Sequence, residues 1–249
     1  MDDIVVAGGL VPALLVPQDA LPEGSDAYPG TKDLDIGLAL GLLDNQRYQA
    51  ITDRLRSAGF VPSLNDRGNE KRQTWHMSEG SGVTIDFLIA PTSDTDRPGH
   101  LRDIEGDFAA VITPGLQLAF ADREPVVIEG RTLRDERATR TVNVTGPGAY
   151  VVLKTLALSD RGENKDAYDL FYLLKHYPGG VRAVAARLAA LLPDPNAQRA
   201  VEILRADFSA PDRIGPTRTS LFLHGRNDPA TQADAAGFVL LLLRQLGEG

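Results

Sequence analysis

Two aspartates separated by one residue are the first sign of chemistry in this chain. Asp33 and Asp35 stand in the run Thr31-Lys32-Asp33-Leu34-Asp35, and Asp86 interrupts the apolar run 83–89. Side chains at positions i and i+2 of a strand share a face, so Asp33 and Asp35 would present their carboxylates side by side. A carboxylate inside an apolar strand is costly unless it is paired or binds a metal. Three carboxylates from two strands are typical of sites that hold two Mg²⁺ ions roughly 3.5–4 Å apart for phosphoryl transfer. The pattern favours nucleotide transfer, and a polar edge strand or a structural ion pair is the alternative.

A glycine pair precedes these aspartates. Gly8 and Gly9 end the first predicted strand, and the apolar run 10–16 follows them. Backbone N–H groups at such a strand-to-helix turn can approach phosphate oxygens because no Cβ intervenes. A simple tight turn is the alternative. The stretch 17–30, rich in Pro, Gly, Ser and Asp, predicts a mobile loop.

The second half carries a different set of charged residues. Lys154 stands among aliphatic residues in a predicted helix, where its ammonium group must extend to solvent or meet an anion such as a triphosphate. Asp166 and Asp169 share a face of the next predicted helix. Asn164 is the expected N-cap of that helix, and acidic residues near a helix start also suit its dipole. Helix-start chemistry is therefore an alternative explanation for both carboxylates.

The predicted elements that position these residues change in type near residue 140. Hydrophobic patterning predicts strands over residues 4–10, 33–40, 60–64, 73–77, 83–89 and 126–129, and one helix over 45–58. After residue 146 it predicts helices over 148–159, 164–176, 181–191, 196–206 and 231–246. We therefore expect an α/β (α+β) fold in which a mixed-sheet catalytic domain, residues 1–140, precedes an α-helical bundle domain, residues 141–249.

Composition and charge limit the function further. The 249 residues include no cysteine and four scattered histidines, which excludes disulfides, thiolate zinc sites and a cysteine nucleophile. The longest apolar run is too short to span a bilayer, so a cytoplasmic protein without a membrane partner is expected.

The net charge of −8 is unevenly distributed along the chain. Residues 1–130 hold 21 Asp and Glu against 10 Lys and Arg, whereas residues 131–226 hold 10 against 15. The basic second half could attract a polyanion. Its densest stretch contains Arg131, Arg134, Arg137 and Arg140; a solvated face is the alternative for this stretch, because Asp135 and Glu136 are interleaved with the arginines.

Taken together, these motifs resemble the AbiEii/MenT-like nucleotidyltransferases, toxins of type IV toxin-antitoxin systems in the DNA polymerase β-like superfamily. The resemblance covers Gly-Gly at 8–9, Thr-x-Asp-x-Asp at 31–35, Asp86, Leu-Lys-x-x-Ala-Leu at 153–158, Arg161 and Lys-Asp-x-x-Asp-Leu at 165–170. It is most specific over residues 153–170. Leu10 stands where relatives often have Ser or Thr, and relatives usually begin with a helix, whereas this chain opens in its first predicted strand.

The resemblance implies a polymerase β-like core, an NTP substrate and Mg²⁺ at a two-metal site. The implied metal ligands are Asp33, Asp35 and Asp86. Lys154 would hold the nucleotide phosphates, and Asp166 would complete the catalytic set. The remaining expected nucleotide-binding residues are Gly8, Gly9, Thr31, Lys32 and Asp169.

The implied acceptor is RNA, particularly a tRNA 3′ end, with growth arrest as the outcome and an antitoxin encoded alongside. Two other hypotheses stay open at this point. The acceptor hydroxyl could belong to a small molecule such as an aminoglycoside or to a protein. The chain could also be a catalytically silent binding module that retains the fold.

Overall fold

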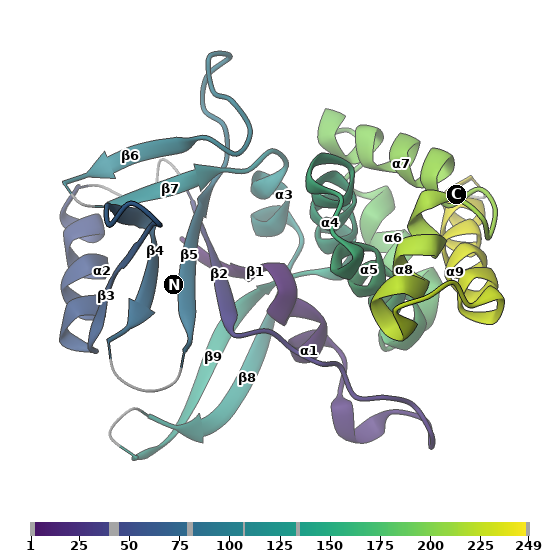
Figure 1. The fold of residues 1–249 in the computed structure, drawn as a ribbon, viewed down its shortest axis with the longest axis horizontal. Helices are drawn as coiled ribbons and strands as arrows, with labels where there is room; N and C mark the ends of the chain where they lie inside the picture. Colours follow the sequence, from purple (N-terminus) through teal and green to yellow (C-terminus); the bar gives the residue numbers. More distant parts are fainter. Residues whose placement is uncertain (1–2, 40–44, 79–81, 107, 133–134, 248–249) are drawn as a thin grey trace. The chain divides into compact units, whose positions relative to one another are not determined.

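The computed structural model describes residues 3–39, 45–78, 82–106, 108–132 and 135–247 (Figure 1). The chain divides into two compact units, of which the first comprises Met1–Leu10 and Gly30–Thr145 and the second comprises Val11–Pro29 and Gly146–Gly249. The expected fold class, a mixed sheet followed by helices, is confirmed. The division into functional domains of residues 1–140 and 141–249 stays a prediction. The compact units differ from it, because the first extends to Thr145 and the second includes residues 11–29.

The first unit is built on one mixed sheet. Its strands are β1 (Ile4–Ala7), β2 (Asp33–Leu38), β3 (Phe60–Leu64), β4 (Glu70–Met77), β5 (Thr84–Ile89), β6 (Leu101–Glu105), β7 (Phe108–Ile112), β8 (Arg123–Arg131) and β9 (Arg137–Thr145). The strand order is β3-β4-β5-β2-β1-β9-β8, with β7 also pairing β5 and β6 pairing β7. In the centre, β2 runs parallel to β5 and antiparallel to β1.

The core of this unit lies on one face of the central strands. Along β5, Ile85, Phe87 and Ile89 are buried, and the residues between them are only half-buried. This alternation follows from the two-residue period of a strand. Helix α2 (Asn45–Ser57) adds Tyr48 to the same cluster, which also contains Trp75. Asp86 therefore belongs to the face of β5 opposite the core.

The opposite face is partly covered by a short helix, α3 (Leu116–Ala121). Leu116 is fully buried and packs over Gly37, where a Cβ would come within 3.1 Å of the Leu116 Cδ1 atom. The same Cβ would lie 2.9 Å from the Val5 side chain. Gly37 thus lets α3 approach the sheet closely beside the aspartate pair.

Strands β8 and β9 form a long hairpin at one edge of the sheet, beyond the other strands of the unit (Figure 1). They pair continuously from Arg123 opposite Thr145 to Arg131 opposite Arg137. The sequence predicted only residues 126–129 of this hairpin. It also predicted no regular element at β6, β7, α3 or β9. Val127 is 60% exposed, so burial does not impose the usual alternation that identifies a strand.

The second unit is helical. Its helices are α1 (Val11–Leu15), α4 (Pro147–Arg161), α5 (Asn164–His176), α6 (Gly180–Ala189), α7 (Pro195–Asp207), α8 (Ile214–His224) and α9 (Pro229–Gly247), with a short 3-10 turn η2 (Gln18–Ala20) between α1 and α4. The 3-10 turn η1 (Gly8–Leu10) belongs to the first unit. Helix α5 is central, because every residue from Asp166 to Leu174 is buried. No helix in the described ranges is both long and apolar enough to cross a membrane.

The helix boundaries mostly follow local signals. Gly162 ends α4 in the left-handed conformation, which a residue without a Cβ adopts at little cost. Asp194 caps α7 with its side chain, and Pro195 follows at the first helical position. The expected N-cap Asn164 is wrong by one residue, because Glu163 occupies that position and its side chain makes no capping bond.

Candidate active site

The three expected metal ligands lie on one face of two adjacent strands. In the parallel pair β2 and β5, Asp35 is the Cα partner of Asp86, and Asp33 is the partner of Thr84. Because paired residues of neighbouring strands point to the same side of a sheet, all three carboxylates belong to the face opposite the core. The sequence predicted the two strands, but the register that places Asp35 beside Asp86 is a tertiary result.

Asp86 is a half-buried carboxylate on which the positive charge of Lys71 acts, and it makes no direct ion pair with a described residue. It accepts a hydrogen bond from the Thr74 hydroxyl on β4. Burial raises the pKa of Asp86 and so does the negative charge of Asp33, whereas the Thr74 hydrogen bond and the charge of Lys71 lower it. The net effect is a pKa above the ordinary value, so Asp86 is a better proton acceptor than an exposed aspartate. The role of Asp86 as a metal ligand stays a prediction.

Two threonine hydroxyls form hydrogen bonds with Asp33. Asp33 is exposed and accepts a hydrogen bond from the Thr84 hydroxyl, 2.5 Å away. Its backbone N–H donates to the Thr31 hydroxyl oxygen at 3.1 Å. Lys32 between them is exposed. Thr31 and Lys32 are therefore held directly beside the aspartate pair.

Gly8 is required by the position of Asp35. Its φ of +66° lies in the left-handed region, and a Cβ there would come within 1.6 Å of the Asp35 Oδ2 atom. The glycine pair and the Asp-x-Asp motif, more than twenty residues apart in the sequence, therefore meet in the fold. The adjacent Gly9 belongs to the same 3-10 turn. The turn therefore lies against the Asp35 carboxylate, and its role in binding phosphate stays a prediction.

The donor set fits a hard divalent cation, although the side chains are not gathered around one point. Among the described residues, no three His, Cys, Asp or Glu side chains form a group ready to hold a metal ion. Asp33 and Asp86 accept hydrogen bonds from threonine hydroxyls instead. Carboxylate oxygens are nevertheless the ligands that Mg²⁺ prefers. Burial and the negative charge of Asp33 raise the pKa of Asp86, and a bound cation would offset both effects.

In the second unit, Lys154 is buried between two carboxylates. Its side chain on α4 is 7% exposed, and its Nζ atom lies 2.9 Å from Asp166 Oδ1 and 2.7 Å from Asp169 Oδ2 on α5. Burial alone would lower the pKa of Lys154, but the charges of Asp169 and Asp166 outweigh this effect and raise it. Lys154 therefore stays protonated and holds the two helices together.

Two further cations complete this cluster. Arg161 donates from Nε to Asp166 Oδ2 at 2.7 Å and from Nη2 to Oδ1 at 2.8 Å. Lys165 donates to both oxygens of Asp169, at 2.9 and 3.0 Å. Burial raises the pKa of Asp166, yet Arg161 and Lys154 outweigh it and hold that pKa below its ordinary value. The sequence motif contains Arg161 and Lys165, but it predicted no role for them.

Tyr28 is the member of this cluster that no local pattern indicated. It belongs to the stretch predicted as a mobile loop, yet it is 8% exposed and donates its hydroxyl to Asp169 Oδ1 at 2.6 Å. Its ring stacks on Tyr168 at a centroid distance of 6.1 Å. The partners are more than 130 residues apart, so only the tertiary fold brings them together.

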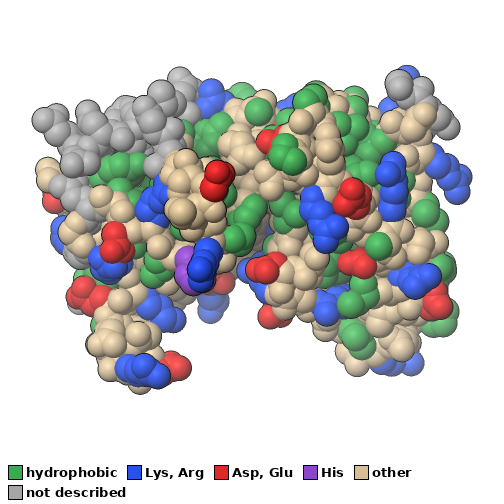
Figure 2. Space-filling model, turned by 90° about the horizontal axis from the view of Figure 1, so that it is seen from above, with side chains coloured by type: hydrophobic (Ala, Val, Ile, Leu, Met, Phe, Trp, Pro, Cys, Tyr) green, Lys and Arg blue, Asp and Glu red, His purple; other side chains and the backbone are tan. Residues whose placement is uncertain are grey.

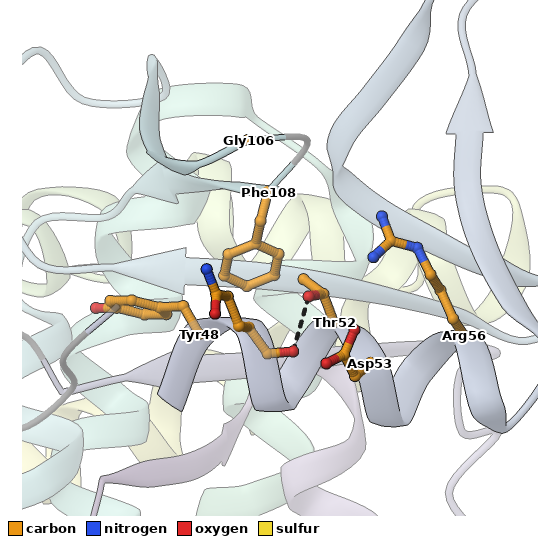
Figure 3. A pocket seen from close by; sticks show the side chains of 7 residues that line it. Tyr48, Thr52, Asp53, Arg56, Gly106 and Phe108 are labelled. Atoms are coloured by element: carbon orange, nitrogen blue, oxygen red, sulfur yellow. Dashed lines mark hydrogen bonds between the residues drawn. The ribbon is translucent and has the colours of Figure 1, made fainter. Parts of the chain in front are cut away.

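A separate hollow in the first unit contains none of the expected site residues. Its volume is about 360 Å³, and Tyr48, Thr52, Asp53 and Arg56 of α2 line it together with Gln49, Gly106 and Phe108 (Figure 3). In Figure 3 the Phe108 ring points toward α2, and the Thr52 hydroxyl donates to the backbone oxygen of Gln49 at 2.9 Å. Both polar and aromatic groups face this space, but nothing connects it with phosphoryl chemistry.

Comparison with known proteins gives one family. The chain matches the sequence model of the family described as "Nucleotidyl transferase AbiEii toxin, Type IV TA system" over residues 30–247. No match was found among curated proteins. The matched range includes Asp33, Asp35, Asp86 and the Lys154 cluster, whereas Gly8 and Tyr28 lie outside it.

Proposed function

Because the chain belongs to the AbiEii family of nucleotidyltransferase toxins, we propose that it transfers a nucleoside monophosphate from an NTP to an acceptor hydroxyl in a Mg²⁺-dependent reaction. The acceptor is an RNA, in particular a tRNA 3′ end. Transfer to that end arrests growth, and an antitoxin encoded alongside counteracts it. The observation that carries the proposal is the set of three carboxylates on one face of β2 and β5.

Asp33, Asp35 and Asp86 would hold the metal. When bound, Mg²⁺ aligns an acceptor hydroxyl with the α-phosphate and stabilises the pyrophosphate leaving group. The hydroxyl oxygen bonds to the α-phosphorus as the bond from phosphorus to the bridging oxygen breaks, and pyrophosphate leaves. Asp86 accepts the hydroxyl proton, since burial raises its pKa above the ordinary aspartate value.

The Lys154 cluster is suited to a phosphate chain. It contains three cations, Lys154, Arg161 and Lys165, against two carboxylates, Asp166 and Asp169, so one positive charge is in excess. An ammonium group has three donors, and Lys154 uses two of them among the described residues. The side chains of Arg161 and Lys165 are 58% and 32% exposed, so an anionic phosphate would meet the excess charge at the accessible side of the cluster. The backbone of Gly8 and Gly9 and the side chains of Thr31 and Lys32 would bind the nucleotide beside Asp33 and Asp35.

The experiment that tests this function incubates purified protein and Mg²⁺ with total RNA and each labelled NTP in turn. Label in the tRNA fraction, lost on chelation of Mg²⁺, supports the proposal and identifies the nucleotide. Label in a small-molecule or protein fraction would show that the acceptor is not RNA. If the protein binds neither Mg²⁺ nor NTP, it is a catalytically silent binding module and the proposal is wrong.

A further inference from the structure

Asp169 is the most constrained carboxylate in the helical unit. Its side chain is fully buried, and three different groups donate to it: Tyr28, Lys165 and Lys154. Oδ1 accepts from Tyr28 at 2.6 Å and from Lys165 at 2.9 Å. Oδ2 lies 2.7 Å from Lys154 and 3.0 Å from Lys165. The carboxylate therefore cannot rotate without breaking at least one of these contacts.

Tyr28 and Lys165 also bind each other. The Lys165 Nζ atom donates to the Tyr28 hydroxyl at 2.8 Å and lies 5.0 Å from the centre of the Tyr28 ring. Tyr28 thus accepts from one side and donates to Asp169 on the other, so the three groups form a closed triangle. Burial, followed by the charge of Asp169, raises the pKa of Tyr28. The phenol consequently keeps its proton and remains a donor over the whole physiological range.

The backbone around Tyr28 is fixed as well. Its N–H donates to the Gln18 Oε1 atom at 2.9 Å, and the Tyr172 hydroxyl donates to the same oxygen at 3.1 Å. Gln18 in turn donates to the Val16 carbonyl oxygen at 2.8 Å. These bonds hold the stretch 16–28 on α5, so the tyrosine is not a side chain that reaches its partner by chance.

We propose that Tyr28 and Lys165 are positioning residues, which fix the Asp169 carboxylate so that Lys154 keeps its remaining donor available for the NTP phosphate. This inference rests on the proposed function. It assigns to Tyr28 and Lys165 a role that acts through Asp169 and Lys154 and does not require contact with the nucleotide. Without the triangle, Asp169 would be free to turn toward Lys154 alone and draw the ammonium group away from a phosphate.

The test is a comparison of transfer kinetics and NTP binding in the full-length protein. Tyr28→Phe removes one hydroxyl and keeps the ring that stacks on Tyr168. We expect it to raise the KM for NTP by about tenfold, the effect of one hydrogen bond to a charged group, with kcat changed less than about threefold. Lys165→Met should act in the same direction, and Lys165→Arg, which keeps the charge, should restore most of the NTP affinity.

The matched control is Tyr48→Phe. It deletes the hydroxyl of another buried tyrosine, which lines the hollow beside α2 and lies outside the Lys154 cluster. Its KM for NTP should stay near the wild-type value. A second comparison places Tyr28→Phe in an Asp169→Asn background, where it should have little further effect because the two act through one carboxylate.

Two results would overturn the inference, and they are distinguishable. If wild-type protein transfers a nucleotide but Tyr28→Phe and Tyr48→Phe have the same KM for NTP, Tyr28 is not a positioning residue and the proposed function stands. If wild-type protein neither binds nor transfers any NTP, the proposed function fails and the inference fails with it.

Discussion

At the residue scale, Asp86 on β5 combines burial with the nearby negative charge of Asp33. Asp33 contributes negative charge to the surroundings of Asp86, and burial adds to the cost of ionising Asp86. The threonine hydroxyls of positions 74 and 84 each offer a single hydrogen bond, which is weaker compensation than a cation. Transfer activity should therefore be more sensitive to substitutions that change the charge of these residues than to substitutions that change their shape.

Asp33→Ala or Asp35→Ala should abolish transfer and leave the fold intact. Without metal, either variant should be as stable as the wild type or slightly more stable, because one of the crowded negative charges is gone. Transfer assays and thermal unfolding with and without Mg²⁺ measure this. Asp66→Ala, at an exposed position in the first unit, is the control and should change neither. Transfer that survives Asp33→Ala or Asp35→Ala would rule out the metal assignment.

Asp86→Asn preserves shape and removes charge. Transfer should fall by at least about two orders of magnitude, the usual contribution of general acid-base catalysis. If Asp86→Asn transfers nucleotide at nearly the wild-type rate, Asp86 has a structural role and not a catalytic one.

The same variant has a defined effect on stability. The pKa of Asp86 is raised in the fold, so the protonated form contributes stability that is present at acid pH and lost as pH rises through the folded pKa. In metal-free protein at pH 7, Asp86→Asn should therefore be more stable than the wild type. The difference should vanish as pH falls below the ordinary aspartate range. Denaturant unfolding of both proteins between pH 3 and pH 7, roughly the span over which carboxylates titrate, measures it.

Lys154→Ala should raise the KM for NTP at every ionic strength. The ammonium group is buried, and salt screens buried charges weakly. The substitution also leaves Asp166 and Asp169 with fewer cations, so it should lower the melting temperature. Transfer rates against NTP concentration at low and moderate salt measure the effect. Lys175→Ala is the control, since Lys175 contacts Asp234 and lies outside the cluster. If the KM of Lys154→Ala for NTP returned to the wild-type value at moderate salt, Lys154 would not act on the NTP as a buried charge.

At the element scale, the turn after β1 and the strand β2 depend on each other. Gly8 combines a left-handed backbone with the closest approach of any glycine Cβ position to a side chain among the described residues. The approaching group is Asp35, one of the residues on which the proposed chemistry depends. A substitution at Gly8 should therefore disturb the site as well as the fold.

Gly8→Ala and Gly68→Ala form a matched pair for this prediction. Both glycines have positive φ, +66° and +78°, so both variants lose about 1–2 kcal/mol from backbone strain. Only Gly8 has a neighbour that blocks a Cβ, and the additional loss should be about 1–3 kcal/mol. Gly8→Ala should also lose transfer activity, whereas Gly68→Ala should keep it. Equal unfolding free energies for the two variants would show that Asp35 moves aside freely.

At the scale of the whole molecule, charge is mixed along the surface. On the face shown in Figure 2, blue Lys and Arg side chains are interspersed with red Asp and Glu and do not form one basic patch. The arginine-rich stretch of the sequence is the β8–β9 hairpin, where Arg131, Arg137 and Arg140 are exposed and Arg134 lies outside the described residues. Arg131 pairs with Asp135 at 2.8 Å. RNA contact through this hairpin stays a prediction.

Charge reversal at Arg131 and Arg137 tests that prediction. If the hairpin binds RNA phosphates, the double variant should need more RNA at low salt and show a flatter salt dependence, because fewer counterions are released. Its KM for NTP should not change. Charge reversal at the exposed Arg182 and Arg205 of α6 and α7 is the matched control for net charge. If the hairpin variant needs the same RNA concentration for transfer as the wild type, the hairpin does not bind the RNA acceptor.

Elements with strong local signals could be predicted from the sequence. It gave the bounds of β3 and α5 as the structure has them, and β5 and α2 to within a residue, because alternating and helical hydrophobic patterns are properties of the chain. It did not indicate α8, whose apolar residues follow no clear helical stripe, or β9, which is largely exposed. The spacing of Asp33 and Asp35 and the isolated Asp86 were enough to predict a shared acidic site.

Tertiary structure decided everything that depends on contacts between distant residues. The register of β2 with β5 places Asp35 beside Asp86, and the turn after β1 brings Gly8 against Asp35. In the helical unit, packing of α4 on α5 buries Lys154 between two carboxylates, and residues 16–28 deliver Tyr28 to Asp169. None of these pairs has a local pattern, because hydrogen bonds and ion pairs between remote segments are selected by packing and desolvation of the folded chain and not by neighbours in the sequence.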